Sequence, residues 1–322
     1  MATGGVNLSK EFFDLLKAIG ESKSKQEEDR IILKEVVRLK QKLETPTGAP
    51  GSGPGQNQLL TSKKRAKEFL VRLLYVEMLG HDAGFGYIKA VEMAASSSLY
   101  HKRTGYLVCS ACLSPEHEFR FMLVNQMQRD LQSSNVLEIC GGILAATSLI
   151  TEDMVPAVSG EVVKLVTHES ETVRKKAIIC LHRFYQLAPE SVTREDLVEK
   201  LRKVLCDRDP SVMGSSLNVI EGLAAEDATV FKDLIPSLVS ILKQIGEHRL
   251  PSDFDYHRVP APWLQMKIVR INSIAKSSTC GFIGGIYWRM NVFSHLLFPA
   301  NKLDSNFGHY RKGRRRRQFG NV

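Results

Sequence analysis

The sequence predicts an all-α fold of stacked helical hairpins, and three observations lead to that prediction. Four short segments look like copies of one unit, and each opens an apolar stretch of helical length; their key positions are Arg103, Val136, Val173 and Val212. These positions are 33, 37 and 39 residues apart, and most of the stretches follow a second helix-like stretch. No segment alternates apolar and polar residues between hairpin turns, so β-structure should be close to absent. This pattern is typical of an α-solenoid of HEAT or armadillo type.

The composition agrees with stacked helices and places the basic charge at one end of the chain. Of the 322 residues, 43% are hydrophobic and only 7% are aromatic. Residues 277–322 contain eight Lys or Arg and one acid, which accounts for +7 of the formal net charge of +9. The first 276 residues therefore carry only +2, and the basic charge is not a property of the predicted fold.

Residues 1–44 are expected to form two helices. Residues 8–19 read as a short amphipathic helix, because four apolar side chains recur on one face: Phe12, Leu15, Leu16 and Ile19. Ser24 and Glu27 make the S-x-x-E pattern of a capping box, which predicts that a second helix starts at Ser24. One face of this helix must pack against another element, because its apolar residues recur three or four positions apart; they are Ile32, Val36, Leu39 and Leu43.

The rest of the chain divides into a loop, a helical region and a tail. Residues 45–60 are rich in Gly and Pro and are expected to form a flexible loop. Residues 61–276 should alternate helices with short turns, and Gly80 suits the left-handed conformation that ends a helix. Capping patterns predict further helix starts at Ser114-Pro115, at Thr193 with Asp196, and at Asp209-Pro210. Residues 277–322 show no helical period and are expected to form a disordered basic tail.

The sequence predicts neither an enzyme nor a cofactor. It contains no phosphate-binding loop, no H-E-x-x-H and no nucleophile elbow. Cys109 and Cys112 form a C-x-x-C in an apolar run, but no second pair completes a zinc site, so core thiols are expected. His81 and Asp82 are interpreted as turn and capping residues rather than a catalytic pair. Trp263 is expected to anchor the core at a helix start.

Two features bear on membranes. No signal peptide opens the chain, so the sequence predicts a protein that starts in the cytosol. The apolar segment 281–299 has Arg289 near its middle, and an Arg at mid-bilayer costs roughly 2.5 to 3.5 kcal/mol on insertion scales. A membrane span is therefore not expected there.

Basic residues gather at the start of a predicted helix and form the candidate site: Lys63, Lys64, Arg65, Lys67 and Arg72. Each Lys or Arg near an anionic lipid surface contributes roughly 1 kcal/mol of attraction, so the cluster is a candidate contact for anionic lipid. A solvated helix face explains the same residues. The sequence leaves both interpretations open.

Five blocks of the sequence form a distinctive series: Leu73 to Asp82 (LLYVEMLGHD), Phe85 to Ile88, Lys102 to Leu107, Asn125 to Ser133 and Val259 to Gln265. These blocks resemble the large chains of clathrin-type adaptor complexes, the adaptins, and they occur in that family's order. Within the family, further segments look most like the epsilon type of large chain: Leu205 to Asp209 with Val212 to Gly214, and Ser240 to Gln244 with Arg249 to Pro251.

The resemblance covers roughly residues 8–276 and implies a non-enzymatic subunit for vesicle-mediated protein sorting. In that family the N-terminal trunk of the large chain holds a small sigma chain and contacts the other large chain, of beta type. A medium mu chain completes the complex, which an Arf-type GTPase recruits to trans-Golgi network or endosomal membranes. The resemblance thus implies a cytoplasmic protein at the membrane periphery, without a small-molecule substrate.

The chain departs from the family pattern in three places. It leaves the pattern near Lys276, whereas the family's large chains continue to a hinge and an ear. In the related alpha chain the region of the basic cluster is a phosphoinositide site; Lys67 and Arg72 fall on its basic positions, whereas Ala66 and Glu68 replace others. Gly20 falls where alpha and gamma chains use an arginine for acidic dileucine signals, so the resemblance does not imply that recognition here.

An alternative function comes from a different class of protein. The cluster Arg314 to Arg317 is also the pattern of a nuclear-localisation or nucleic-acid patch. A HEAT-repeat adaptor that uses this tail in the nucleus or on nucleic acid is therefore the second hypothesis. Against it, few aromatic residues that could stack on bases stand near the arginines, so nucleic acid is not the expected partner.

Overall fold

The computed structural model describes residues 9–44 and 56–277, and in these residues the regular structure is almost entirely helical. The two strands found there, β1 (Asp255–Tyr256) and β2 (Val259–Pro260), form one short antiparallel hairpin in which Tyr256 faces Val259. The prediction of an all-α solenoid is thus confirmed. The chain divides into two compact units, Met1–Ser216 and Leu217–Val322.

The first unit contains the helices α1 to α10 and the start of α11. Their bounds are α1 Lys10–Gly20, α2 Lys25–Glu44, α3 Gln56–Met78, α4 Tyr87–Ala94, α5 Leu99–Cys112, α6 Phe119–Leu131, α7 Val136–Leu149, α8 Val155–Leu165, α9 Glu171–Leu187, α10 Arg194–Leu205 and α11 Pro210–Glu226. Two short 3-10 helices precede α4 and α8: η1 Gly84–Gly86 and η2 Glu152–Met154.

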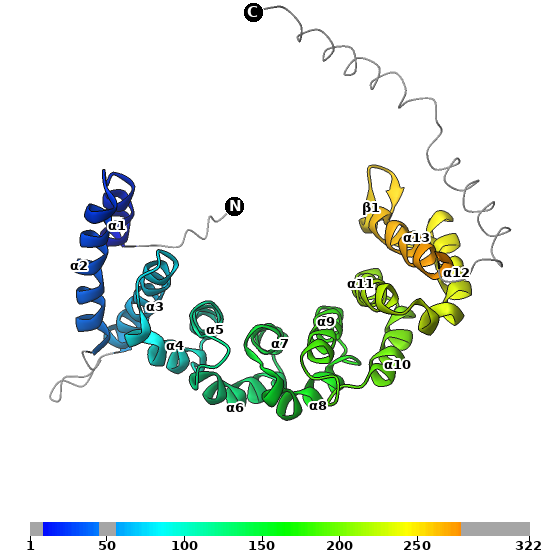
Figure 1. Cartoon of the computed structure of the whole chain (residues 1–322), viewed down its shortest axis with the longest axis horizontal. Coiled ribbons are helices and arrows are strands. Elements are labelled where there is room, and N and C mark those ends of the chain that lie inside the picture. Colours follow the sequence, from blue (N-terminus) through cyan, green and yellow to red (C-terminus); the bar gives the residue numbers. More distant parts are fainter. Residues whose placement is uncertain (1–8, 45–55, 278–322) are drawn as a thin grey trace, which may run out of the picture. The chain divides into compact units, whose positions relative to one another are not determined.

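The helices from α3 to α9 form two layers (Figure 1). In one layer α3, α5, α7 and α9 contact one another in that order, and in the other α4, α6 and α8 do the same. The four repeat positions found in the sequence lie within the first five residues of α5, α7, α9 and α11, that is, of every second helix. The repeat period therefore corresponds to one helical hairpin, as expected for a solenoid.

The second N-terminal helix begins where the capping box predicts. Ser24 Oγ accepts a hydrogen bond from the Glu27 amide (3.2 Å), and the Glu27 carboxylate accepts one from the Lys23 amide (3.1 Å). The helix α2 places the predicted apolar residues Ile32, Val36 and Leu39 in the core. Residues 45–55 of the expected loop lie outside the described residues, and residues 56–60 belong to α3.

Helix ends follow the sequence at three of the predicted positions. Gly80 has φ = 84°, and the amides of Gly80 and His81 bond back to the carbonyls of Glu77 and Val76, which is the hydrogen-bond pattern of a Schellman cap. Thr193 Oγ1 accepts from the Asp196 amide at the start of α10, and Asp209 Oδ1 accepts from the Ser211 amide at the start of α11.

The predicted helix start at Ser114-Pro115 is wrong. The amide of His117 bonds to the Ser114 carbonyl in a turn, and α6 begins only at Phe119, whose amide donates to His117 Nδ1 (3.2 Å). The Arg120 guanidinium binds the carbonyl of the buried Leu113 (2.5 Å), which holds the chain extended after α5. Because Leu113 is tied to α6 in this way, the chain turns before the next helix starts.

The packing of α4 against α5 depends on Gly105. A Cβ atom at this position would lie 2.3 Å from the amide nitrogen of Ala94 and 2.7 Å from the carbonyl oxygen of Ala90. Both atoms belong to the backbone of α4 and cannot move aside like a side chain. The glycine therefore lets two helix backbones approach more closely than a side chain would permit.

A buried ion pair joins α5 to α6. Lys102, the fourth residue of α5, donates to Asp130 Oδ1 (2.6 Å) near the end of α6. The same carboxylate accepts hydrogen bonds from the Tyr106 hydroxyl (2.6 Å) and the Gln126 amide group (2.7 Å). Lys102 also lies 3.5 Å from Glu138 of α7. We call this set the Asp130 junction, because Asp130 is the group on which most of its bonds converge.

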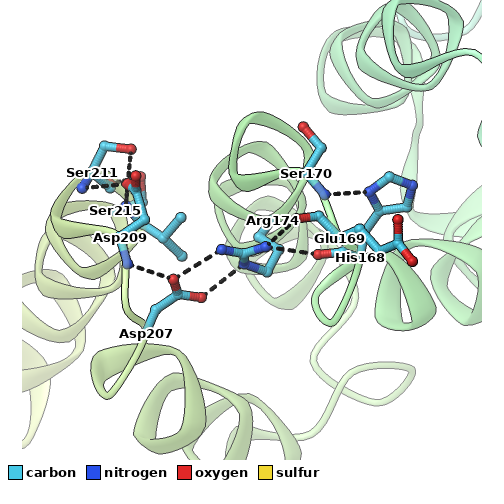
Figure 2. A network of polar contacts seen from close by, with 9 residues as sticks. His168, Glu169, Ser170, Arg174, Asp207, Asp209, Ser211 and Ser215 are labelled. Atoms are coloured by element: carbon cyan, nitrogen blue, oxygen red, sulfur yellow. Dashed lines mark hydrogen bonds and ion pairs between the residues drawn. The ribbon is translucent and has the colours of Figure 1, made fainter.

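A second ion pair occupies the corresponding place two hairpins further on, at α9 and α10 (Figure 2). Arg174, the fourth residue of α9, donates to both oxygens of Asp207 (2.8 and 2.9 Å), which follows α10. Its remaining terminal nitrogen donates to the carbonyls of His168 and Glu169 (both 2.8 Å). Here the cation is the common centre, and we call this set the Arg174 junction.

The second unit begins within α11 and contains η3 (Ala228–Leu234), α12 (Ile235–Gly246), η4 (Ser252–Phe254), the β-hairpin and α13 (Pro262–Ser277). The helix α13 packs on α12 and η3 through Leu264, Ile268 and Ile271.

The expectation that Trp263 anchors the core is wrong, because its side chain is 44% exposed. The core position falls one residue later, on Leu264, so Trp263 is rotated by about 100° away from it. Residues 278–322 of the expected tail lie outside the described residues.

Candidate functional site

The basic cluster that the sequence singles out lies on α3, but its members have different environments. Lys63 and Lys64 belong to the helix, and their side chains lie outside what the structure describes. Arg65 is exposed, Lys67 is half-buried, and Arg72 is buried with 1% of its surface exposed. The structure therefore does not bring these five residues together on one accessible face.

Arg72 belongs to the core rather than to the surface, so its assignment as a lipid contact is wrong. Its guanidinium forms an ion pair with the buried Glu35 of α2 and lies 3.6 Å from Glu68 and 3.5 Å from Glu11 of α1. An arginine held by carboxylates from three helices fixes those helices to one another. The sequence could not reveal this role, because Glu11 and Glu35 are 61 and 37 positions away.

Glu11 completes this arrangement at the surface. Its carboxylate accepts a hydrogen bond from Lys42 (3.0 Å), and the charges of Lys42 and Arg72 hold the pKa of Glu11 below its ordinary value. The helix α1 is thus attached to both α2 and α3 by charged contacts, in addition to the packing of Phe12 against Tyr75.

Lys67 lies beside a second cation. Its Nζ is 3.8 Å from the centre of the Tyr100 ring on α5, a cation–π contact. Burial and the neighbouring charge of Arg103 lower the pKa of Lys67. Among the described residues no carboxylate forms an ion pair with Lys67 or Arg103. What remains of the predicted cluster is Lys67 on α3 next to Arg103 on α5, and we call these two residues the cationic patch. Arg65, two residues before Lys67, points to another side of α3.

A surface that the sequence reading missed runs across α5, α7 and α9. Large apolar side chains stand exposed at the ninth residue of each of these helices, and also at the second residue of α5 and α7. Positions seven apart lie on one face of a helix, and the three helices are neighbours, so these side chains share one side of the layer. We call them the exposed apolar row: Tyr100, Leu107, Leu137, Leu144 and Ile179. Counting from each helix start would have revealed it.

The thiols behave as core groups rather than as a reactive pair. Cys109 is buried, and burial raises its pKa to about 12; burial likewise raises the pKa of the half-buried Cys112 to about 11. Thiols with raised pKa values are poor nucleophiles at neutral pH. Cys206 is exposed, and Cys280 lies outside the described residues.

Three other residues that the sequence singled out, His81, Asp82 and Gly20, lie in turns or at a helix end. Asp82 Oδ1 accepts from the Gly84 amide (2.9 Å) in the turn before η1, and His81 Nε2 lies 3.3 Å from Asp29, so the turn interpretation is confirmed. Gly20 ends α1 with no other group within 4 Å of its Cβ position. Within residues 9–44 and 56–277, no cluster of three metal-ligating side chains occurs, and no helix combines the length and apolarity that crossing a membrane requires.

The fold and these surfaces define a class of protein: an α-solenoid, whose stacked helices present long surfaces to other macromolecules. Residues 28–279 match the family described as the adaptin N terminal region. The match covers more than half of the chain, and the protein therefore belongs to the adaptin N-terminal family.

Two relatives refine the similarity. The AP-4 complex subunit epsilon of Arabidopsis thaliana is 47% identical over 274 residues, which are 85% of this chain and 28% of the relative. The AP-4 complex subunit epsilon-1 of Mus musculus is 40% identical over 257 residues, which are 80% of this chain and 22% of the relative. The chain thus spans about a quarter of the length of these relatives.

A structural comparison supports the fold. The chain is similar to part of a homology model of the full-length AP-3 complex in an intermediate open conformation, with a TM-score of 0.53 and 23% identity. The match covers 68% of this chain and 35% of that one. At this identity the likeness concerns the arrangement of helices.

Proposed function

We propose that the protein is a non-enzymatic, epsilon-type subunit of a membrane-trafficking adaptor complex. The observation that carries the proposal is the 47% identity, over 85% of the chain, to a relative named as a subunit of the AP-4 complex. The adaptin match over residues 28–279 supports it. The basic segment 311–317, on which the nuclear alternative rests, lies outside the matched residues.

In this proposal the solenoid holds a small sigma chain and contacts a beta-type large chain, a medium mu chain and an Arf-type GTPase. The complex acts in the cytoplasm at the periphery of trans-Golgi network or endosomal membranes. The exposed apolar row is the surface we assign to the small chain. Leu107 and Leu144 are each 56% exposed on neighbouring helices, and exposed apolar side chains that adjoin one another are typical of protein interfaces.

Co-expression with the small sigma chain of the same organism tests this proposal. A tagged form of the chain should retain the sigma chain through purification, and the double variant Leu107→Asp with Leu144→Asp should lose it, because two charges would then be buried in the interface. A folded parent chain that retains no sigma chain contradicts the proposed function.

A matched control comes from the other layer of helices. Phe121 and Met122 on α6 are 56% and 54% exposed, and the variant with aspartate at both positions should still retain the sigma chain. If this control loses the sigma chain and the first variant keeps it, the function stands and the assignment of the surface is wrong.

We further propose that the cationic patch, with Lys63 and Lys64, contacts anionic lipid when the complex is on the membrane. The absence of a described carboxylate beside Lys67 and Arg103 supports this proposal. Replacing Lys63, Lys64, Arg65 and Lys67 by glutamine should weaken binding to vesicles that contain phosphoinositide. Unchanged binding would instead support the solvated-face interpretation.

A further inference from the structure

The outward face of α2 carries apolar side chains that the core does not use. The helix buries Ile32, Val36 and Leu39 against the protein. On the opposite side Leu33 is 58% exposed and Val37 is 55% exposed, and the two stand one helical turn apart. An apolar ridge of this kind costs solubility and is not needed for the packing of α1 and α3.

Three cations stand beside this ridge. Arg30, Lys34 and Arg38 recur every four residues, are exposed, and form no ion pair or hydrogen bond with any described residue. The two basic residues that follow on α2 do have partners. Lys40 lies 5.1 Å from the centre of the Phe85 ring, and Lys42 binds Glu11.

The positive charge of this face is not neutralised by the helix itself. Between Arg30 and Gln41 the sequence contains one acid, Glu35. That side chain is 2% exposed and forms the ion pair with Arg72 inside the protein. From Arg30 onward the outward face therefore presents three positive charges without a carboxylate among them, and the exposed Glu27 stands one turn before Arg30.

The geometry of the helix places the two features in parallel strips. At 100° per residue, Leu33 and Val37 point between Lys40 on one side and Arg30 with Lys34 on the other. Arg30 to Arg38 spans about 12 Å at 1.5 Å per residue. A strip of aliphatic residues flanked by cations is the arrangement with which helices lie on a membrane surface, where the cations meet lipid phosphates and the apolar side chains enter the headgroup region.

We propose that this face of α2, formed by Arg30, Leu33, Lys34, Val37 and Arg38, binds the surface of an anionic lipid bilayer. A bilayer fits better than a protein partner, because the face is a convex helix surface without a groove or an aromatic anchor, whereas protein interfaces concentrate their affinity in such anchors. The site is separate from the cationic patch on α3 and does not depend on assembly into an adaptor complex.

Vesicle co-sedimentation with the full-length chain tests the proposal. To remove the contribution of the terminal arginines, Arg314, Arg315, Arg316 and Arg317 are replaced by glutamine in every protein compared. Vesicles of phosphatidylcholine with phosphatidylserine should bind this parent, and Arg30→Gln with Lys34→Gln and Arg38→Gln should lower the partition coefficient about a hundredfold, since each cation contributes about fivefold. Leu33→Ser with Val37→Ser should lower it severalfold, and this loss should persist at high salt.

A charge-matched control distinguishes the face from net charge. Lys17, Lys203 and Lys243 are exposed and form i,i+4 ion pairs elsewhere on the chain, so replacing all three by glutamine removes the same charge. This control should bind the vesicles within a factor of two or three of the parent, and circular dichroism should show the same helix content in all variants.

Two results would overturn the proposal. One is equal vesicle binding by the parent and the Arg30, Lys34, Arg38 variant. The other is a variant that keeps vesicle binding but loses binding to an acidic peptide such as polyglutamate, which would make the face a protein-docking surface. Neither result touches the proposed adaptor function, which is tested by retention of the sigma chain.

Discussion

The Asp130 junction and the Arg174 junction occupy equivalent places in two hairpins and are built in opposite ways. In both, the fourth residue of a helix in the α3–α9 layer is a buried cation, paired with an acid at or after the end of the next helix. At the first, three donors converge on the carboxylate of Asp130. At the second, the guanidinium of Arg174 donates to one carboxylate and two carbonyls (Figure 2).

At each junction, we expect the indispensable partner of the ion pair to be the one to which other groups are also hydrogen-bonded. The helix between the two junctions supports this view, because its fourth residue is the buried apolar Ile139. A hairpin can therefore close on an aliphatic side chain at this position. Where a charged side chain occupies this position, its removal should lower the free energy of unfolding according to how many buried groups lose their hydrogen-bond partner.

Removal of the acid at the Asp130 junction should have the largest effect. Asp130→Ala leaves the Tyr106 hydroxyl and the Gln126 amide group without this acceptor, and the buried Lys102 with only the more distant Glu138 (3.5 Å). We expect a loss of about 3 to 5 kcal/mol in the free energy of unfolding. Urea unfolding followed by circular dichroism measures it. Asp207→Ala should cost less, about 2 kcal/mol, because Arg174 keeps two carbonyl partners. Equal losses in the two variants would contradict the contrast.

Removal of the cation at the Arg174 junction comes next. Arg174→Met abolishes four hydrogen bonds and leaves the carbonyls of His168 and Glu169 and the carboxylate of Asp207 to find water, so a loss of about 3 kcal/mol is expected. Arg174→Lys keeps the charge but cannot make the two-pronged contact with Asp207, and should recover only part of the loss. Thermal unfolding of the three proteins in one buffer gives the comparison; full recovery by lysine would show that charge alone matters.

Much of the fold could be predicted because it rests on local, periodic features. The spacing of Val136, Val173 and Val212 reports one hairpin per repeat, and caps such as Thr193 and Asp209 act within three residues of themselves. Ser114 followed the same local rule and failed, because Arg120 binds the Leu113 carbonyl and delays the helix. A contact between a loop and the following helix, such as this one, leaves no periodic pattern in the sequence from which it could be predicted.

The candidate site was harder to predict for the same reason. Basic residues in a row suggested one lipid surface, but whether Arg72 faces water is decided by Glu35 from another helix. The buried roles of Lys102 and Arg174 could not be predicted from the repeat, because the apolar Ile139 occupies the equivalent position between them. The expected core position of Trp263 is contradicted by the phase of α13, because the buried Leu264 and Ile268 place the Trp263 side chain on the outside.

Removal of the cation at the Asp130 junction should cost less than its counterpart. In Lys102→Met the buried carboxylate of Asp130 keeps the Tyr106 hydroxyl and the Gln126 amide group as donors, and the methionine fills the space of the lysine stem. We expect a loss of about 1 to 2 kcal/mol, against about 3 kcal/mol for Arg174→Met. The same urea titrations measure both. A larger loss for Lys102→Met than for Arg174→Met would reverse the ranking that the two geometries give.

The smallest effect on stability at neutral pH is expected from replacing Asp209, which caps the start of α11 two residues after Asp207. Burial of Asp209 works to raise its pKa, but hydrogen bonds from the Ser211 hydroxyl, the Ser211 amide and the Val212 amide, together with the charge of Lys175, lower it below the ordinary value of 3.8. A carboxyl group with a lowered pKa in the folded state stabilises the fold above pH 3.8, and this contribution is lost as the pH falls through the folded-state value.

Asp209→Asn should therefore change stability by no more than about 0.5 kcal/mol at pH 7, because asparagine also caps helix starts. Below pH 4 the variant should lose stability less steeply than the parent, since it has no carboxylate there to protonate. Urea midpoints measured from pH 7 to pH 2 test this, with Glu152→Gln, an exposed acid outside both junctions, as the control. If Asp209→Asn loses stability along the same curve as the parent and the Glu152→Gln control, the carboxylate of Asp209 does not contribute to acid unfolding.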